Sequence, residues 1–147
     1  MTREGNGVAA TLGSGAHRYR VETQWARLPE GWTLGDVSSV SVDARDDVYV
    51  FRRADPAVLV FDRGGNLLRA WGEGWFRRPH GIHAAPDGCV YVTDDHAHFV
   101  RKCTPEGRVL LEEMTSRWSS IAPAGDVVLN SSAIIAGLKH ASLVLGA

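Results

Sequence analysis

Short apolar runs alternate with turn-forming residues along most of the chain. From about residue 19 the runs are rich in Val, Leu, Phe and Tyr, and stretches of Gly, Asp, Asn and Pro separate them. This spacing is typical of successive antiparallel strands joined by tight turns, so it predicts an all-β fold. The expected strands lie at about residues 19–22, 40–42, 48–51, 58–61 and 67–71.

The pattern repeats at a fixed distance. Residues 36–71 align with residues 78–113 without a gap, so each residue matches the one 42 positions further on. The matches include Val48-Tyr49-Val50 with Val90-Tyr91-Val92, and Gly65 with Gly107. A period of about 40 residues with four short strands is the size of one β-propeller blade. A β-sandwich with similar strands is the alternative, although a sandwich has no reason for a fixed period.

The repeats divide the chain into three parts. Residues 1–16 are rich in Gly, Ala, Thr and Ser with little pattern, and we expect them to form a disordered lead-in. Residues 17–114 are expected to form two four-stranded antiparallel blades. After Met114 the pattern weakens, although residues 122–129 echo residues 85–92. Residues 115–147 are therefore expected to be a degenerate partial third blade or an irregular tail, whose final apolar stretch fits a short helix equally well.

Two blades and a fraction are too few for a closed ring, because a propeller has about four to eight blades. Each repeat buries its apolar faces against its neighbours, so a partial ring leaves two apolar faces open. We expect an incomplete chain, a poorly stable product, or self-association through these open faces. Three copies of a two-blade chain could close a six-bladed ring.

Composition narrows the classes of partner. The net charge is −1 and no block of like charges occurs, so a nucleic acid partner is not expected. No run reaches the roughly 18 apolar residues of a membrane span, and no convincing secretory signal is present, so we expect a cytoplasmic protein with no membrane partner.

Cys89 and Cys103 lack metal-ligand spacing and are expected to be core-facing thiols, with a disulfide as the minor alternative.

Two segments carry a more specific resemblance. The first is residues 40–55, which include Phe51-Arg52-Arg53, and the second is residues 78–102, which begin with Arg78-Pro79-His80-Gly81. They resemble NHL-type propeller repeats and, more narrowly, bacterial relatives of peptidyl-α-hydroxyglycine α-amidating lyase. The resemblance covers about residues 17–113. It implies a six-bladed propeller with zinc in its central channel and a structural calcium, which converts a peptide ending in α-hydroxyglycine into a peptide amide and glyoxylate.

The resemblance also implies roles for four residues. His80 matches a histidine that binds zinc, and Arg53 falls on the catalytic arginine. The backbone carbonyls of Val40 and Ile82 fall on calcium-binding positions. The family takes three zinc histidines from three blades, whereas Ser38 stands at the position equivalent to His80 in the first repeat. The family's catalytic tyrosine lies in a later blade, so we expect the chain to be inactive on its own.

The histidines themselves leave alternatives open. A catalytic zinc needs three protein ligands, which one histidine cannot supply, so His80 could instead form a hydrogen bond with a neighbouring blade. His83 should face the opposite side of the strand from His80, which makes the two a poor ligand pair. His96 and His98 could hold a metal, or they could belong to a polar loop.

Arg53 ends the second strand of the first repeat, where its fork of donors could face a substrate carboxylate. A solvated loop arginine paired with Asp55 is the alternative, and Arg52 is a competing candidate.

No serine-hydrolase elbow, P-loop, zinc-protease helix or dinucleotide motif is present. Two functions are therefore considered: a fragment of a metal-dependent lyase acting on a small peptide-like substrate, or a non-catalytic NHL propeller module that binds a protein, peptide or sugar.

Overall fold

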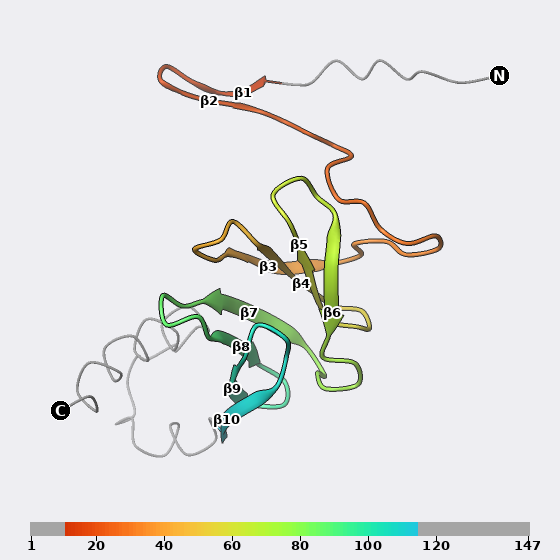
Figure 1. Ribbon diagram of the computed structural model, residues 1–147, viewed down its shortest axis with the longest axis vertical. Coiled ribbons are helices and arrows are strands. Elements are labelled where there is room, and N and C mark those ends of the chain that lie inside the picture. The colour runs from red at the N-terminus through yellow and green to blue at the C-terminus, as the bar shows by residue number, and fades with distance from the viewer. Residues whose placement is uncertain (1–10, 115–147) are drawn as a thin grey trace.

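The computed structural model describes residues 11–114, and these residues form ten strands and no helix. They make one two-stranded sheet and two four-stranded sheets, in which all strand pairs are antiparallel. The all-β class expected from the sequence pattern is therefore confirmed for this part of the chain. The two larger sheets pack together, and the small sheet stands apart from both (Figure 1).

Both four-stranded sheets are simple meanders, in which each strand pairs with the next one along the chain. The first sheet contains β3 (Val37–Val42), β4 (Val48–Arg52), β5 (Val58–Phe61) and β6 (Leu67–Trp71). The second sheet contains β7 (Pro79–Ala84), β8 (Val90–Asp94), β9 (Phe99–Cys103) and β10 (Val109–Met114). Short turns connect successive strands because Gly, Asp and Asn stand between the β-prone runs.

The two sheets repeat each other in detail at the distance of 42 residues found in the sequence. The register shifts at the start of the first strand in both, between Val37 and Ser39 in β3 and between Pro79 and Gly81 in β7. The first turn is closed by equivalent bonds, Asp43 N–H to the Asp47 carbonyl at 3.0 Å and Ala85 N–H to the Cys89 carbonyl at 2.8 Å. The third turn is closed by Asp62 N–H to the Asn66 carbonyl and Thr104 N–H to the Arg108 carbonyl, both at 2.9 Å.

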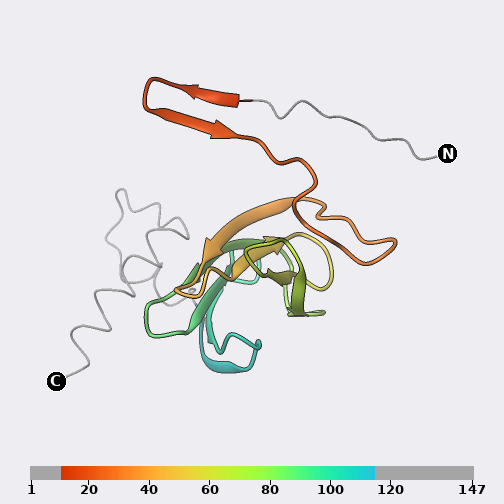
Figure 2. The same cartoon turned by 45° about the horizontal axis from the view of Figure 1, so that its top comes forward.

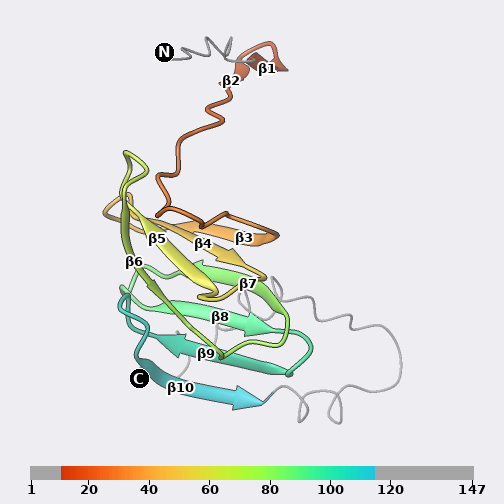
Figure 3. The ribbon, with the colours of Figure 1, turned by 90° about the vertical axis from the view of Figure 1, so that its right-hand side faces the viewer.

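The main core lies between the two sheets, which are stacked face to face (Figure 3). Its buried members include Tyr49, Phe51, Val58, Val60 and Trp71 from the first sheet and Ile82, Val90, Val92 and Cys103 from the second. β3 packs beside β7. Near the carboxyl ends of these two strands, the Ala84 N–H donates to Ser41 Oγ at 2.9 Å. The two sheets therefore run in the same sense, and their corresponding ends lie side by side.

A second, smaller core covers the other face of the first sheet. Its buried members are Val50, Leu59 and Phe61. Residues 25–34, which we call the lead-in segment, pack against them through Trp25, Ala26, Leu28 and Leu34. The Arg27 N–H donates to the Gly65 carbonyl at 2.8 Å, so the lead-in segment is also held by the backbone of the turn between β5 and β6.

The hairpin of β1 (Thr11–Ser14) and β2 (His17–Arg20) projects away from the two large sheets (Figure 2). All of its residues are exposed. Its presence differs from the expectation that residues 1–16 lack structure. Gly15 has a φ of 57°, which lets the chain reverse there. Residues 1–10 and the expected third blade or tail at 115–147 lie outside the described residues.

Cys103 is buried in the main core, Cys89 is half-buried, and both are free thiols. Burial raises the pKa of the Cys103 thiol to about 11. The expectation of a core-facing thiol is confirmed for Cys103, and the disulfide considered as a minor alternative is not formed. Within residues 11–114 no helix is long and apolar enough to cross a membrane.

Candidate functional site

The starts of β3 and β7 and the ends of β4 and β8 lie on one side of the stacked sheets. Phe76, just before β7, contacts Phe51 at the end of β4 and Phe99 at the start of β9, with ring centroids 4.9 and 5.7 Å away. The Gly74 N–H donates to Asp55 Oδ1 at 3.2 Å, which joins the loop after β4 to the segment before β7. We call this side the rim, and it comprises residues 33–38, 52–57, 74–80 and 94–99.

Arg53 is exposed on the rim immediately after β4. Its backbone N–H donates to the Asp36 carbonyl at 2.8 Å, so the main chain that carries it is fixed. An exposed guanidinium on a fixed backbone can bind a ligand carboxylate through two parallel hydrogen bonds. The geometry is compatible with the role that the resemblance implies for Arg53.

Arg52, the competing candidate, is buried, with 4% of its surface exposed. Its guanidinium donates to three carbonyls, those of Thr33 at 2.5 Å, Asp55 at 3.0 Å and Pro56 at 3.0 Å. Burial lowers the pKa of Arg52 from its ordinary value. All of these partners are main-chain groups of the rim, so Arg52 ties the lead-in segment to the loop after β4 and is not presented to a ligand.

Asp94 holds the equivalent position in the second sheet and is also buried, with 2% of its surface exposed. Its carboxylate accepts four backbone N–H groups, from Arg77 at 2.6 Å, Arg78 at 2.9 Å, His96 at 2.9 Å and Ala97 at 2.6 Å. Burial raises the pKa of Asp94, but these donors outweigh it, so the pKa lies below its ordinary value. Sequence reasoning missed this residue, although its distance of 42 positions from Arg52 could have drawn attention to it.

His80 is half-exposed on the rim, with Nε2 3.7 Å from Asp95 Oδ2. Asp95 is already paired with Arg78, which donates from Nε to Oδ1 at 2.7 Å and from Nη2 to Oδ2. The hydrogen bond from Arg78 is the main cause that lowers the pKa of Asp95. His80 falls in the register shift of β7, a bulge that turns its side chain out of the regular alternation. The bulge places His80 beside Asp95, whose negative charge is already paired with Arg78.

The other candidate histidines lie on β7 and in the turn between β8 and β9. His83 lies on β7 opposite Tyr91, and because a bulge separates it from His80, simple alternation does not set their relative orientation. His96 and His98 both lie in the turn between β8 and β9, where His98 has a φ of 58°. The structure therefore places His96 and His98 in a loop at the rim.

The calcium positions implied by the resemblance are equivalent residues on the two inner strands. Val40 pairs with Val50 on β4, and Ile82 pairs with Val92 on β8. The Val40 side chain is 53% exposed, whereas Ile82 is 5% exposed because the first sheet covers it. Both are central residues of their strands, and their assignment to calcium stays a prediction.

Zinc requires a fuller set of ligands than the described residues bring together. A catalytic zinc takes three protein ligands and keeps one open position. Within residues 11–114, no group of three His, Cys, Asp or Glu side chains could hold a metal ion. His80 and Asp95 are at most two ligands, and Arg78 occupies Asp95. The described residues thus do not fit a complete zinc site.

Comparison with known protein families gave no match to any family model.

Proposed function

We propose that the two sheets are successive blades of an NHL-type β-propeller and that their rim belongs to the substrate-binding face of a lyase resembling peptidyl-α-hydroxyglycine α-amidating lyase. The observation that carries the proposal is the position of Arg53 and His80. They come from successive repeats and lie on the same side of the stacked sheets. The two residues are those that the sequence resemblance singles out.

The repeat geometry supports the propeller part of the proposal. Each repeat is a four-stranded antiparallel meander, and the first strands of the two repeats, β3 and β7, pack side by side. Stacking of similar sheets with their first strands adjacent is expected of a propeller, since blades converge on a central axis. Bulges and turns that recur at the same spacing are not expected of a sandwich.

In the proposed function Arg53 binds and orients the substrate. A peptide that ends in α-hydroxyglycine carries a terminal carboxylate, and a bidentate pair with the exposed guanidinium would fix the carbon whose bond to nitrogen breaks. Arg52 and Asp94 hold the rim loops in place around this position. His80 is proposed as one zinc ligand, with the remaining ligands outside the described residues.

The test is zinc uptake and binding of an α-hydroxyglycine peptide by the purified protein. Because the chain is expected to lack part of the active site, the proposal expects it to bind the peptide without releasing glyoxylate. It expects zinc to strengthen this binding and Arg53→Ala to weaken it at least about tenfold. Arg63→Ala is the matched control, because Arg63 is also exposed but lies in the turn between β5 and β6, away from the rim. His80→Ala should lower zinc uptake, while His17→Ala on the exposed hairpin should not. A wild-type protein that neither takes up zinc nor binds the peptide would overturn the proposal.

A second candidate is a non-catalytic propeller module that binds a peptide on the same rim. The observation in its favour is the pairing of Asp95 with Arg78, which leaves the acid nearest to His80 engaged. This candidate expects the peptide to bind equally well with and without zinc. Calorimetry with the same peptide in the presence and in the absence of zinc separates the two candidates.

A further inference from the structure

The β1–β2 hairpin is an element that its own residues specify. Gly15 has a φ of 57° and is the first residue of the two-residue turn, which matches the type II′ turn that hairpins prefer. A Cβ on Gly13 would lie 1.9 Å from the His17 carbonyl oxygen, so a glycine is needed for the two strands to approach there. Both glycines stand where the backbone of the hairpin requires them.

The hairpin has one apolar face, and that face is uncovered. Leu12 pairs directly with Tyr19, so the two side chains lie on the same face, and they are 59% and 63% exposed. Arg18 and Arg20 flank Tyr19 and therefore point to the opposite face. Among residues 11–114 the two strands pair only with each other. A two-stranded hairpin alone is marginally stable in water, so this one needs a surface to pack on.

A matching apolar surface lies on the inner strand of the first sheet. Val40 pairs with Val50, a buried member of the second, smaller core, so Val40 lies on that face of the sheet. Val42, two residues further on, shares the face. Val37 shares it too, because Val37 pairs with Arg52, which is two residues from Val50 on β4. These valines, which we call the β3 row, are 53%, 52% and 42% exposed.

The second repeat shows that such a row is a packing surface. Ile82, the counterpart of Val40, is 5% exposed because the first sheet lies over it. Ala84, the counterpart of Val42, packs against the main core. On the first sheet, the lead-in segment packs against the central strands of this face but leaves the β3 row exposed. The β3 row is therefore an uncovered strip beside a covered one.

The exposed apolar residues of β10 do not form a comparable row. Val109, Leu110 and Leu111 are 40%, 45% and 51% exposed. They are consecutive residues, and the register shifts between Val109 and Leu111. They consequently lack the two-residue spacing that lines up side chains on one face of a strand. Among residues 11–114 the β3 row is the surface that best matches the apolar face of the hairpin.

The hairpin and the surroundings of the β3 row carry opposite charges. Residues 11–20 contain two Arg and no acid, so their net charge is +2 with histidine neutral. Residues 36–47, which contain β3 and the turn after it, hold four Asp and one Arg, so their net charge is −3. Asp36 is exposed, and the Asp46 side chain is 60% exposed. Opposite charges favour association of the hairpin with this surface and disfavour pairing of two hairpins.

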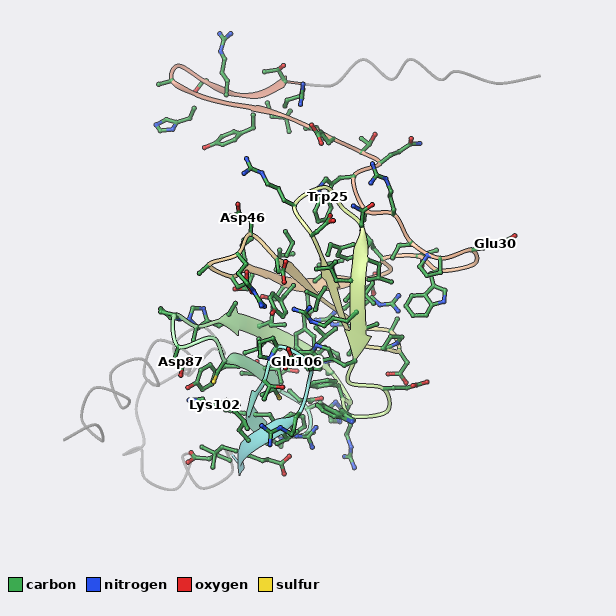
Figure 4. All side chains as sticks on the ribbon, in the orientation of Figure 1. Trp25, Glu30, Asp46, Asp87, Lys102 and Glu106 are labelled. Atoms are coloured by element: carbon green, nitrogen blue, oxygen red, sulfur yellow. The ribbon has the colours of Figure 1, made fainter. Side chains whose placement is uncertain are left out.

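The hairpin does not lie on the β3 row of its own chain. Trp25, at the start of the lead-in segment, lies beside the turn between β5 and β6 (Figure 4) and donates from Nε1 to the Arg63 carbonyl at 3.0 Å. On the other side of Trp25 the hairpin stands clear of the two large sheets. The hairpin and the β3 row of one chain are thus both uncovered, and a second copy has what each of them lacks.

We propose that the β1–β2 hairpin of one copy packs on the β3 row of a second copy, with Leu12 and Tyr19 against the valines. The exchange is reciprocal about a two-fold axis, so each copy gives one hairpin and receives one. The contact forms twice, which doubles the apolar area that the dimer buries. The β3 row is where the proposed propeller would place a neighbouring blade, and in the dimer the hairpin of the partner takes that place. The inference does not depend on the proposed reaction.

The molar mass in solution tests the inference. Light scattering coupled to gel filtration should give about twice the chain mass of 16.0 kDa. Val40→Lys and Tyr19→Lys should each return the mass to that of one chain, because each places a charge in the contact. Leu68→Lys is the matched control, since Leu68 is 47% exposed on β6, outside the contact. Tyr19→Phe keeps the aromatic ring and should leave the dimer intact.

The alternatives give different results. A wild-type monomer or trimer would overturn the inference. Dissociation by Val40→Lys but not by Tyr19→Lys would overturn it as well, because something other than the hairpin would then cover the row. Equal dissociation by Leu68→Lys would also contradict it. Circular dichroism of each variant checks that the strands are retained, and Val42→Lys replaces Val40→Lys if that variant unfolds. These measurements need neither zinc nor peptide, so their failure is distinguishable from failure of the proposed function.

Discussion

Arg52 and Asp94 hold the same position in the two repeats and carry opposite charges. The difference follows from the groups that surround them: Arg52 meets three carbonyls, and Asp94 meets four N–H groups. In each repeat the buried charge ties the segment entering the inner strand to the loop after the second strand. Burying either charge is tolerable only because these bonds compensate the loss of water.

Asp94→Ala should lower the free energy of unfolding by about 3 kcal/mol or more, because it leaves several buried N–H groups without an acceptor. Urea denaturation measures the change. Asp87→Ala is the control, because Asp87 also accepts a backbone N–H and pairs with Lys102 but lies exposed at the other end of β8. It should cost about 1 kcal/mol or less. Equal effects of the two variants would contradict the role assigned to Asp94.

The same residue makes stability depend on pH. The pKa of Asp94 is lower in the folded protein than in the unfolded chain, where it is about 3.9. The carboxylate therefore stabilises the fold fully above that value, and the contribution is lost as pH falls through the lower folded pKa. Stability measured between about pH 6 and pH 3 should fall, and Asp94→Asn should flatten part of the fall. An unchanged slope in Asp94→Asn would show that other carboxylates carry it.

At the scale of elements, the turn after the third strand is built around a glycine and a preceding tryptophan. Gly65 and Gly107 have φ values of 82° and 90°, and Trp25 and Trp71 close over them. Outer strands are thereby fastened to the next sheet by packing that only a glycine permits. This packing explains why a glycine stands at this turn in both repeats, although few other positions are identical between the repeats.

Gly107→Ala should destabilise the protein by more than Gly74→Ala. Both glycines have positive φ, so both substitutions strain the backbone by about 1 kcal/mol. Only at Gly107 would the new Cβ collide with a buried ring, that of Trp71, whereas nothing lies within 4 Å at Gly74. Thermal unfolding of the two variants measures the difference. Equal melting temperatures would show that the ring moves away without cost.

Much of the element structure could be predicted from the sequence, because strands and turns depend on local pattern. Adding 42 to the residue numbers of each strand in the first sheet gives the corresponding strand of the second sheet to within one residue. The strand expected at residues 19–22 overlaps β2, but β1 and the turn at Gly15 were not predicted, since residues 11–16 show little alternation. The burial of Arg52 could not be predicted either, because it depends on the lead-in segment folding back over the first sheet.

The surroundings of the candidate site residues could not be predicted from the sequence. Arg53 is exposed and its neighbour Arg52 is buried, because side chains alternate at the end of β4 and because the Arg52 guanidinium meets the Thr33 carbonyl. The contact with Thr33 is a tertiary effect. Asp95 and Arg78 meet beside His80 because they flank the paired residues Pro79 and Asp94 at the open end of the β7–β8 hairpin. The sequence resemblance singles out His80, and the bulge in β7 determines which of these side chains it faces.

At the scale of the whole molecule, two sheets share one core and one rim. The lead-in segment covers part of the remaining apolar face of the first sheet, so the stack is better protected on this side than two repeats alone would be. The rim collects Arg53, His80 and their supporting residues from successive repeats. A function that uses both residues therefore depends on the stack and not on either sheet alone.

The most direct test of the account is zinc-dependent binding of an α-hydroxyglycine peptide, compared by calorimetry between the wild-type protein and Arg53→Ala. The account predicts binding that zinc strengthens and that weakens at least about tenfold in Arg53→Ala but not in Arg63→Ala. Binding that is equal in all three proteins, or no binding to a folded wild-type protein supplied with zinc, would contradict it.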